Sequence, residues 1–474
     1  MSDKSIKSMS DLTSMHRDVP TRPQPSMPPK RDSFPFRWIK RLIWLYFWLL
    51  LFEGALRKWI LPDYSDYLLI VRDPVAIGII WFAIRDRLFQ ASSIAIAFAV
   101  LVPAFCLLGT IQVMNGLSPA VAAFGLRTYF LHLPVIFVIA ATFRFRDFQE
   151  LGRAISIVSI AMTPLVVLQY LSPQDAWVNF AAGGEAGQMS ASGEHIRTPG
   201  LFPFISGMVA FNACAFAVAL GAEFTPGFLS RRLRWLAVMA CVICGALSGS
   251  RSVVVAMFLV LVGVLVGTCL SLKSFKGALR VGGLSIVAMG LLSTSVVLQT
   301  GIDGLVERFA DAGLGQGLLL RAVQPFLDFG EYLKDGTVLG SGLGLGTNAG
   351  SRLATGDVQF ILGEGEWERV ILEAGIVLGL LYLLCRAWLT VSLGLDALRA
   401  AGRGYLLPLL LWFACAPDLL LGQWGPPNQL GFAVFVTGLT LAALRVERDA
   451  MRSGATLGTR PLGSLYHKTV PSRA

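Results

Sequence analysis

The stretch that decides the fold is Gly-Glu-Gly-Glu-Trp-Glu-Arg-Val-Ile-Leu-Glu-Ala-Gly-Ile-Val-Leu-Gly, residues 363–379, which passes from a polar loop into an apolar run. On a helix, at about 100° per residue, Glu366, Arg369 and Glu373 lie within roughly 60° of one another. The last two glycines lie on the opposite face, with a spacing that suits close helix packing. Ionisable residues at the end of a membrane span are costly unless they line a cavity, so this face marks a candidate site.

The rest of the chain is predominantly apolar. It is 54% hydrophobic and only 15% charged, which lies far outside the balance of a soluble domain. Runs about long enough to cross a ~30 Å hydrocarbon layer occur near 38–52, 67–84, 93–113, 121–142, 151–171, 204–221, 234–247, 252–272, 279–298, 370–390, 404–421 and 429–445. These runs predict an all-α, polytopic integral membrane protein with about 12 transmembrane helices and a long external loop between spans 9 and 10.

The predicted organisation has five parts. They are a disordered, Pro-rich cytoplasmic tail (1–36), transmembrane helices 1–9 (37–298), an external loop with amphipathic helices (299–369), transmembrane helices 10–12 (370–445) and a second cytoplasmic tail (446–474). The external loop contains two amphipathic pieces, 304–310 and 321–330, that would lie along the membrane surface.

Basic residues predict the orientation. Of the 40 Lys and Arg residues, 29 fall in the two tails and in alternate connections, at 85–92, 143–153, 222–234, 271–280 and 386–403. By the positive-inside rule these connections and both termini are cytoplasmic. The net charge of +10 then reflects orientation, and we expect no nucleic-acid partner.

Three arginines outside the opening stretch are candidate binding residues. The span before Arg251 has only about 13 strongly apolar residues, roughly 20 Å, so Arg251 is drawn below the outer surface. An anion-binding role is favoured over an interfacial, snorkelling one. Arg127 lies about 9 Å inside its span and either pairs with an acid on a neighbouring helix or binds substrate. Arg197, in an external loop, is either a solvated charge or a second binding residue.

Metal and nucleotide chemistry find no support in the sequence. No Cys/His or Asp-x-Asp cluster occurs, and two of the four histidines lie in the tails. The glycine-rich run 340–347 lacks the Lys-Ser/Thr of a phosphate-binding loop. We therefore expect neither a metal nor a cofactor.

Four motifs resemble those of the bacterial O-antigen polymerase and O-antigen ligase family. They are Arg-Thr-Pro-Gly-Leu-Phe at 197–202, Ser-Gly-Ser-Arg-Ser at 248–252, the Gly-x-Gly-x-Gly loop at 342–346 and Leu-Glu-Ala-Gly at 372–375. The resemblance covers roughly residues 38–445. Many ligases of the family carry a His shortly before the last motif, where this chain has Glu364, Glu366 and Glu368. The exopolysaccharide polymerase branch therefore fits better than the ligase branch.

The resemblance implies a function and partners. Family members transfer a saccharide linked through pyrophosphate to undecaprenol, outside the bacterial cytoplasmic (inner) membrane, without metal or nucleotide. It implies that this chain polymerises such oligosaccharide repeat units into exopolysaccharide or O-antigen for the cell envelope. The implied partners are the polyprenyl-pyrophosphate-linked oligosaccharide, membrane lipid, a flippase and a chain-length regulator.

The chemistry of such a transfer assigns roles to the charged residues. Arginines stabilise a departing diphosphate, and a carboxylate accepts the proton of the acceptor hydroxyl. We expect Glu366 to act as the base, with Arg369 orienting it; Glu364 and His195 are the alternatives. The predicted catalytic residues are Glu366 and Arg369, and the predicted substrate-binding residues are Arg127, Arg197, Arg251 and Glu373.

Other functions remain as alternatives to a polymerase. A ligase-type glycan transfer, a transporter or flippase of a lipid-linked sugar, and a non-catalytic membrane protein are each compatible with the composition. Transporters often show paired repeats and charges near the midplane, whereas here the ionisable residues gather at the outer ends of spans. This placement favours the glycosyltransferase.

Overall fold

Helices account for about 80% of the residues that the structure describes, as the apolar composition predicts. The computed structural model describes residues 34–89, 92–184, 195–271, 275–292, 295–311, 323–356, 361–363 and 365–452. Among these residues no strand is present, which confirms the all-α class. Most of both predicted tails, together with Glu364 and Arg321, lies outside the described residues.

Eight helices of the described chain are long and apolar enough to cross a membrane by length and composition. They are Pro62–Arg85, which contains α3 (Asp73–Arg85); α4 (Ser93–Met114); Pro119–Thr142, which contains α5 (Pro119–Leu126) and α6 (Leu133–Thr142); α7 (Phe145–Leu171); α8 (Ile205–Phe224); α10 (Arg251–Leu270); α16 (Glu366–Gly402); and α18 (Pro427–Arg452). The protein is therefore membrane-embedded. The count of 12 spans remains a prediction.

The remaining predicted spans correspond to shorter or more polar helices. These are α1 (Phe34–Ala55), α9 (Arg231–Leu247), α11 (Phe275–Leu292), α12 (Val296–Asp311) and α17 (Leu407–Leu420). The predicted ninth span, 279–298, falls across the end of α11 and the start of α12. The amphipathic piece 304–310 forms the second half of α12.

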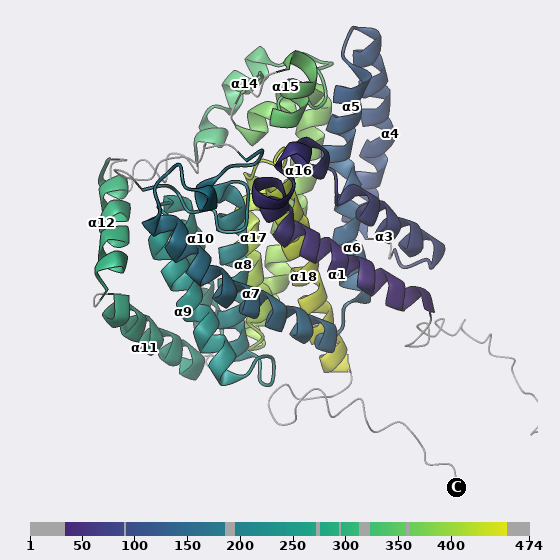
Figure 1. The fold of residues 1–474 in the computed structure, drawn as a ribbon. Helices are drawn as coiled ribbons and strands as arrows, with labels where there is room; N and C mark the ends of the chain where they lie inside the picture. Colours follow the sequence, from purple (N-terminus) through teal and green to yellow (C-terminus); the bar gives the residue numbers. More distant parts are fainter. Residues whose placement is uncertain are drawn as a thin grey trace, which may run out of the picture.

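Two helices form the centre of the bundle. In the most apolar 18-residue stretches of α8 and α18, 83% of the residues are buried, compared with 28% in those of α4 and α10. α8 packs against α9, α10 and α17, while α18 packs against α6 and α17 (Figure 1). The run Asn-Ala-Cys-Ala-Phe-Ala-Val-Ala, residues 212–219 of α8, has small side chains at alternate positions. Small residues allow neighbouring helices to approach closely on every side.

Local side-chain caps set several helix starts. Ser92 accepts a hydrogen bond from the backbone N–H of Ala95 at the start of α4. Ser230 caps α9 in the same way, and Thr347 caps α15 (Asn348–Thr355). Such caps satisfy backbone donors that a helix leaves without partners in its first turn.

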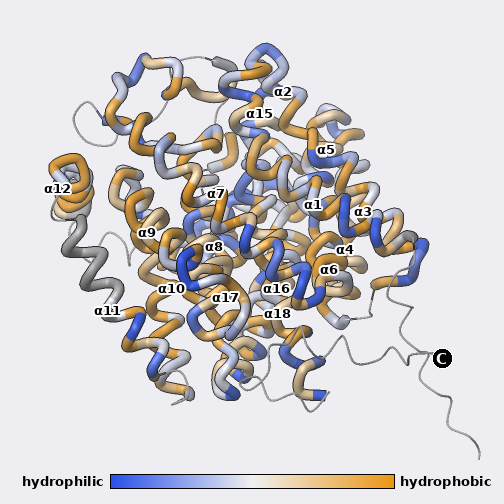
Figure 2. Tube along the Cα trace, turned by 60° about the horizontal axis from the view of Figure 1, so that its bottom comes forward, coloured by the Kyte–Doolittle hydropathy of each residue, from blue (hydrophilic) through white to orange (hydrophobic). Residues whose placement is uncertain are grey.

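The bundle has one end that carries the short surface helices. α14 (Phe329–Asp335) and α15 lie together at the top of Figure 1, beyond the outer part of α16, and α11 lies towards the opposite end. Apolar residues predominate along α4, α9, α10 and α12 in Figure 2. The predicted external loop therefore contains helical elements that cover the end of the bundle where α16 begins.

Candidate functional site

The charged stretch 366–374 folds back on the helix that follows it. Gly375 has φ 77° and ψ 165°, which breaks α16 into two limbs. Arg386 Nη1 lies 2.5 Å from Glu366 Oε1 although 20 residues separate them. A straight helix would place these residues about 30 Å apart. The expectation of one continuous helix is therefore wrong beyond Glu373, because the chain turns a corner at Gly375.

Close backbone contacts fix this corner. A Cβ on Gly375 would lie 2.1 Å from the carbonyl oxygen of Val338, so only glycine fits. The N–H of Ile376 donates to the Thr337 carbonyl at 3.1 Å, and the N–H of Ser341 donates to the Leu372 carbonyl at 2.7 Å. The irregular segment 337–341 thus supplies partners for backbone groups that the break leaves without helical bonds.

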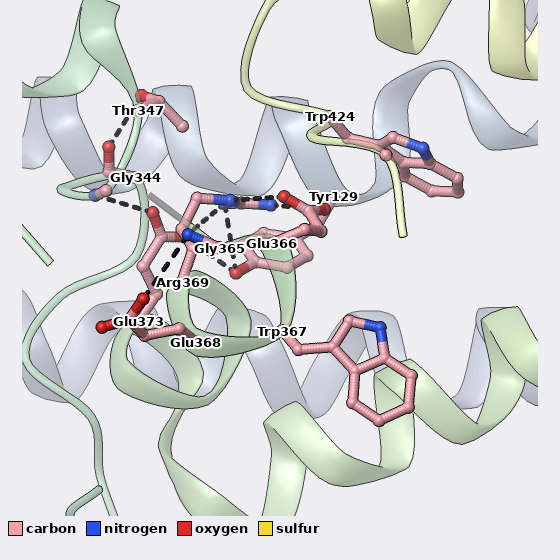
Figure 3. Close-up of polar contacts among 12 residues, drawn as sticks. Tyr129, Gly344, Thr347, Gly365, Glu366, Trp367, Glu368, Arg369, Glu373 and Trp424 are labelled. Atoms are coloured by element: carbon pink, nitrogen blue, oxygen red, sulfur yellow. Dashed lines mark hydrogen bonds and ion pairs between the residues drawn. The ribbon is translucent and has the colours of Figure 1, made fainter. Parts of the chain in front are cut away.

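Within the first limb, Arg369 bridges the two predicted acids, as the helical spacing predicts (Figure 3). Its Nε and Nη2 donate to the two carboxylate oxygens of Glu366, at 2.9 and 3.0 Å. Its Nη1 donates to Glu373 Oε2 at 2.8 Å. The Tyr129 hydroxyl also donates to Glu373 Oε2, at 2.7 Å. Neither carboxylate side chain has exposed surface.

A second buried arginine, Arg386, completes the cluster. Besides Glu366, it donates to the carbonyl oxygens of Leu419 and Gly422, at 2.9 and 3.0 Å, at the end of α17. Its guanidinium lies 3.9 Å from the centre of the Trp424 ring. The distribution of basic residues assigns Arg386 to a cytoplasmic connection, whereas the structure buries it within the bundle beside Glu366. Two carboxylates and two guanidiniums make the cluster neutral overall.

The glycine-rich run 340–347 holds the cluster from the other side. The N–H of Gly346 donates to Glu373 Oε1 at 2.8 Å. Gln112 donates to the Glu373 carbonyl at 2.9 Å and accepts from the N–H of Leu343 at 2.8 Å. A Cβ on Gly346 would lie 2.5 Å from Arg369 Cγ. The run is therefore packed between Gln112 of α4 and the charged limb of α16.

This geometry gives Glu366 a structural role. Its two oxygens accept three hydrogen bonds from Arg369 and Arg386, and its side chain is closed off from any substrate. A general base must come within hydrogen-bond reach of the proton that it removes, and a buried carboxylate held by two guanidiniums offers no such approach. The arrangement therefore disfavours Glu366 as the base, and it commits Glu373, predicted to bind substrate, to Arg369, Tyr129 and Gly346 within the protein.

Arg127 forms the ion pair that was one of its two predicted roles. It donates to both carboxylate oxygens of Asp73 on α3, at 2.6 and 2.8 Å, and to the Leu69 carbonyl. His132 Nε2 lies 3.2 Å from the same carboxylate, and His132 Nδ1 lies 3.1 Å from the Tyr46 hydroxyl. Arg127 thus ties α3 to the Pro119–Thr142 span and is committed to a protein partner.

The structure brings together the two segments that carry Arg197 and Arg251. The Thr198 hydroxyl donates to the carbonyl oxygen of Leu247 at 3.0 Å, which joins the loop 195–204 to the turn between α9 and α10. Arg251 is the first residue of α10, and both arginines are partly exposed. Gly249 in this turn has φ 58°. Two motifs 50 residues apart in sequence therefore meet at the N-terminus of α10.

Buried polar groups hold the Arg197 loop in place. Lys58 donates to the carbonyls of Gly200 and Phe202, at 2.8 and 3.1 Å, and burial lowers the pKa of Lys58 to about 7. Gln169 donates to the Gly200 carbonyl and accepts from its N–H. The loop is thus bonded to two helical elements, and His195 Nδ1 lies 3.1 Å from the Tyr170 carbonyl.

The sequence alone did not indicate that Arg386 and Tyr129 belong to this cluster. Arg386 interrupts an apolar run, which is a signal of a functional or paired charge in a membrane helix. Tyr129 gives no comparable signal, because a tyrosine within a span is common near interfaces.

No family model, curated protein or solved structure matches the chain. Among the described residues, no group of three His, Cys, Asp or Glu side chains is arranged to hold a metal ion. The function is therefore argued from the site itself.

Proposed function

We propose that this protein is an integral-membrane glycosyltransferase that polymerises polyprenyl-pyrophosphate-linked oligosaccharide repeats on the external face of the bacterial cytoplasmic membrane. The observation that carries the proposal is the meeting of the Arg197 and Arg251 segments, joined by the Thr198 bond to Leu247. The predicted family motifs contain both arginines. The membrane-embedded helical bundle supports the same function, because a polyprenyl donor reaches its enzyme through the lipid.

The proposed transfer needs a site for two phosphates. The acceptor oxygen attacks the anomeric carbon, and the bond from that carbon to the diphosphate oxygen breaks with its electron pair on the diphosphate. Guanidinium groups match phosphate oxygens with paired, charge-assisted hydrogen bonds. The N–H groups at the start of α10 add a partial positive charge beside Arg251. Arg197 and Arg251 would thus stabilise the leaving diphosphate.

The test replaces the guanidinium of Arg251 with an ammonium. Arg251→Lys keeps the charge but loses the planar fork, so we expect the polymerisation rate to fall roughly 10- to 100-fold, as the loss of a charge-assisted bond worth about 1.5–3 kcal/mol predicts. The assay measures chain growth from purified lipid-linked repeat in proteoliposomes.

A matched control separates this effect from a general effect of Arg-to-Lys changes. Arg146, whose side chain is 88% exposed, is replaced by Lys and should leave the rate unchanged. Full activity of Arg251→Lys would reduce Arg251 to an interfacial charge. Movement of the labelled repeat across the bilayer without chain growth by the wild-type protein would instead identify a flippase.

A further inference from the structure

α17 stops short of the outer end of the bundle. It has 14 residues, about 21 Å, against a hydrocarbon core of ~30 Å. α17 runs antiparallel to α10, because Gly267 packs on Leu406 and Gly263 packs on Phe413. Stepping outward equally along both helices from these two pairs, the end of α17 reaches the level of Val253 to Ala256. It thus ends about two to five residues, roughly 3–8 Å, below Arg251.

Asp418 lies in the last turn of α17, at the end of the helix that stops below Arg251. Its carbonyl oxygen accepts from Arg386 Nη2 at 3.3 Å and from Trp424 Nε1 at 3.0 Å. Its carboxylate Oδ1 accepts from Gln429 Nε2 at 3.3 Å. Within the described part of the chain, Oδ2 accepts no hydrogen bond and neither oxygen forms an ion pair.

The surroundings of Asp418 are polar and partly open. Asp418, Gln423 and Gln429 are each neither buried nor fully exposed, and they cluster where α17 turns into α18. A carboxylate in an otherwise apolar helix is costly unless it pairs with a partner or has a function. Arg386, which donates to the Asp418 carbonyl, is bonded to Glu366 and to backbone carbonyls and forms no ion pair with the Asp418 carboxylate among the described residues.

We propose that Asp418 is the general base of the transfer, an inference that rests on the proposed function. Glu366 and Glu373 have no exposed side-chain surface, and their oxygens are bonded to Arg369, Arg386, Tyr129 and Gly346. Asp418 is instead partly exposed, and its Oδ2 accepts no hydrogen bond among the described residues. The acceptor hydroxyl passes its proton to Asp418 Oδ2 as its oxygen bonds to the anomeric carbon.

The test uses the full-length protein in proteoliposomes with purified lipid-linked repeat. Asp418→Asn keeps the shape and the Gln429 contact but cannot accept the proton, so chain growth should fall roughly 10²- to 10⁴-fold. Binding of the lipid-linked repeat should remain within about twofold, since the diphosphate site is untouched. Asp418→Glu should recover part of the rate.

Controls make each outcome decisive. Asp396→Asn, at the far, exposed end of α16, should keep the wild-type rate. If Asp418→Asn does not fold, Asp418→Ser replaces it, and full activity in any folded variant without the carboxylate overturns the assignment. If the wild-type protein makes no polymer from this donor, the proposed function fails before the role of Asp418 is reached.

Discussion

At the residue scale, the feature that costs the most free energy to bury is a cluster of four charged side chains with no net charge. Glu366, Arg369, Glu373 and Arg386 are each 4% exposed or less. Bringing such groups out of water costs several kcal/mol per ion, which close pairing and additional hydrogen bonds must offset. The helical spacing predicted the first three, but Arg386 could not be predicted as a partner because only the fold-back at Gly375 brings it to Glu366.

Glu366→Gln should therefore destabilise the protein instead of merely stopping catalysis. The substitution leaves Arg369 and Arg386 with one carboxylate between them, and breaking a buried pair in this way costs about 3–5 kcal/mol. Yield should drop and the unfolding midpoint in detergent should fall.

Glu368→Gln is the matched control for this prediction. Its side chain is partly exposed and lies near the start of the helix, where its carboxylate accepts from the N–H of Gly365 at 3.4 Å. A loss of at most about 1 kcal/mol is expected for such an exposed charge. Wild-type stability of Glu366→Gln together with lost polymerisation would restore Glu366 as the base.

At the element scale, the break in α16 determines where the charged limb lies. The sequence correctly indicates a helix that carries Glu366, Arg369 and Glu373, followed by a membrane span. It does not indicate the corner, because Gly375 and Gly379 are equally compatible with a straight helix that packs on a neighbour. In the structure a Cβ on Gly379 would lie 2.8 Å from the Val370 carbonyl, so the close approach is to the preceding limb of the same chain.

Gly375→Ala should disrupt the corner. The backbone there has φ 77° and ψ 165°, a region that only glycine adopts readily and that costs other residues about 1–3 kcal/mol. The added methyl also meets the Val338 carbonyl. We expect a lower unfolding midpoint and weaker polymerisation, measured on purified protein.

Gly402→Ala, where nothing lies within 4 Å of the new methyl, should be neutral. Equal behaviour of the two variants would show that the corner tolerates a side chain.

At the scale of the whole molecule, composition predicts the class well and the spans less well. The apolar content alone indicates an all-α membrane bundle, and within the described residues most of the predicted runs lie on helices. Helix length explains why the number of spans is predicted less well. α17 and α9 have 14 and 17 residues, too few to cross a ~30 Å hydrocarbon core as straight helices, although the sequence alone suggests a full span at each. The pairing of the 198 and 247 segments depends on long-range packing that periodicity cannot reveal.

The orientation of the bundle is the last prediction, and it rests on the basic residues together with the arrangement of the helices. α11 and α14 lie towards opposite ends of the bundle in Figure 1, and the basic connections predict that the α11 end is cytoplasmic. In a background without the seven native cysteines, Lys276→Cys and Asp335→Cys are labelled in intact cells with a membrane-impermeant maleimide. Asp335→Cys should react, because α14 faces outward, and Lys276→Cys should react only after the membrane is permeabilised. The reverse pattern would place the Arg197 and Arg251 segments on the cytoplasmic side, where a donor presented outside the cell could not reach them.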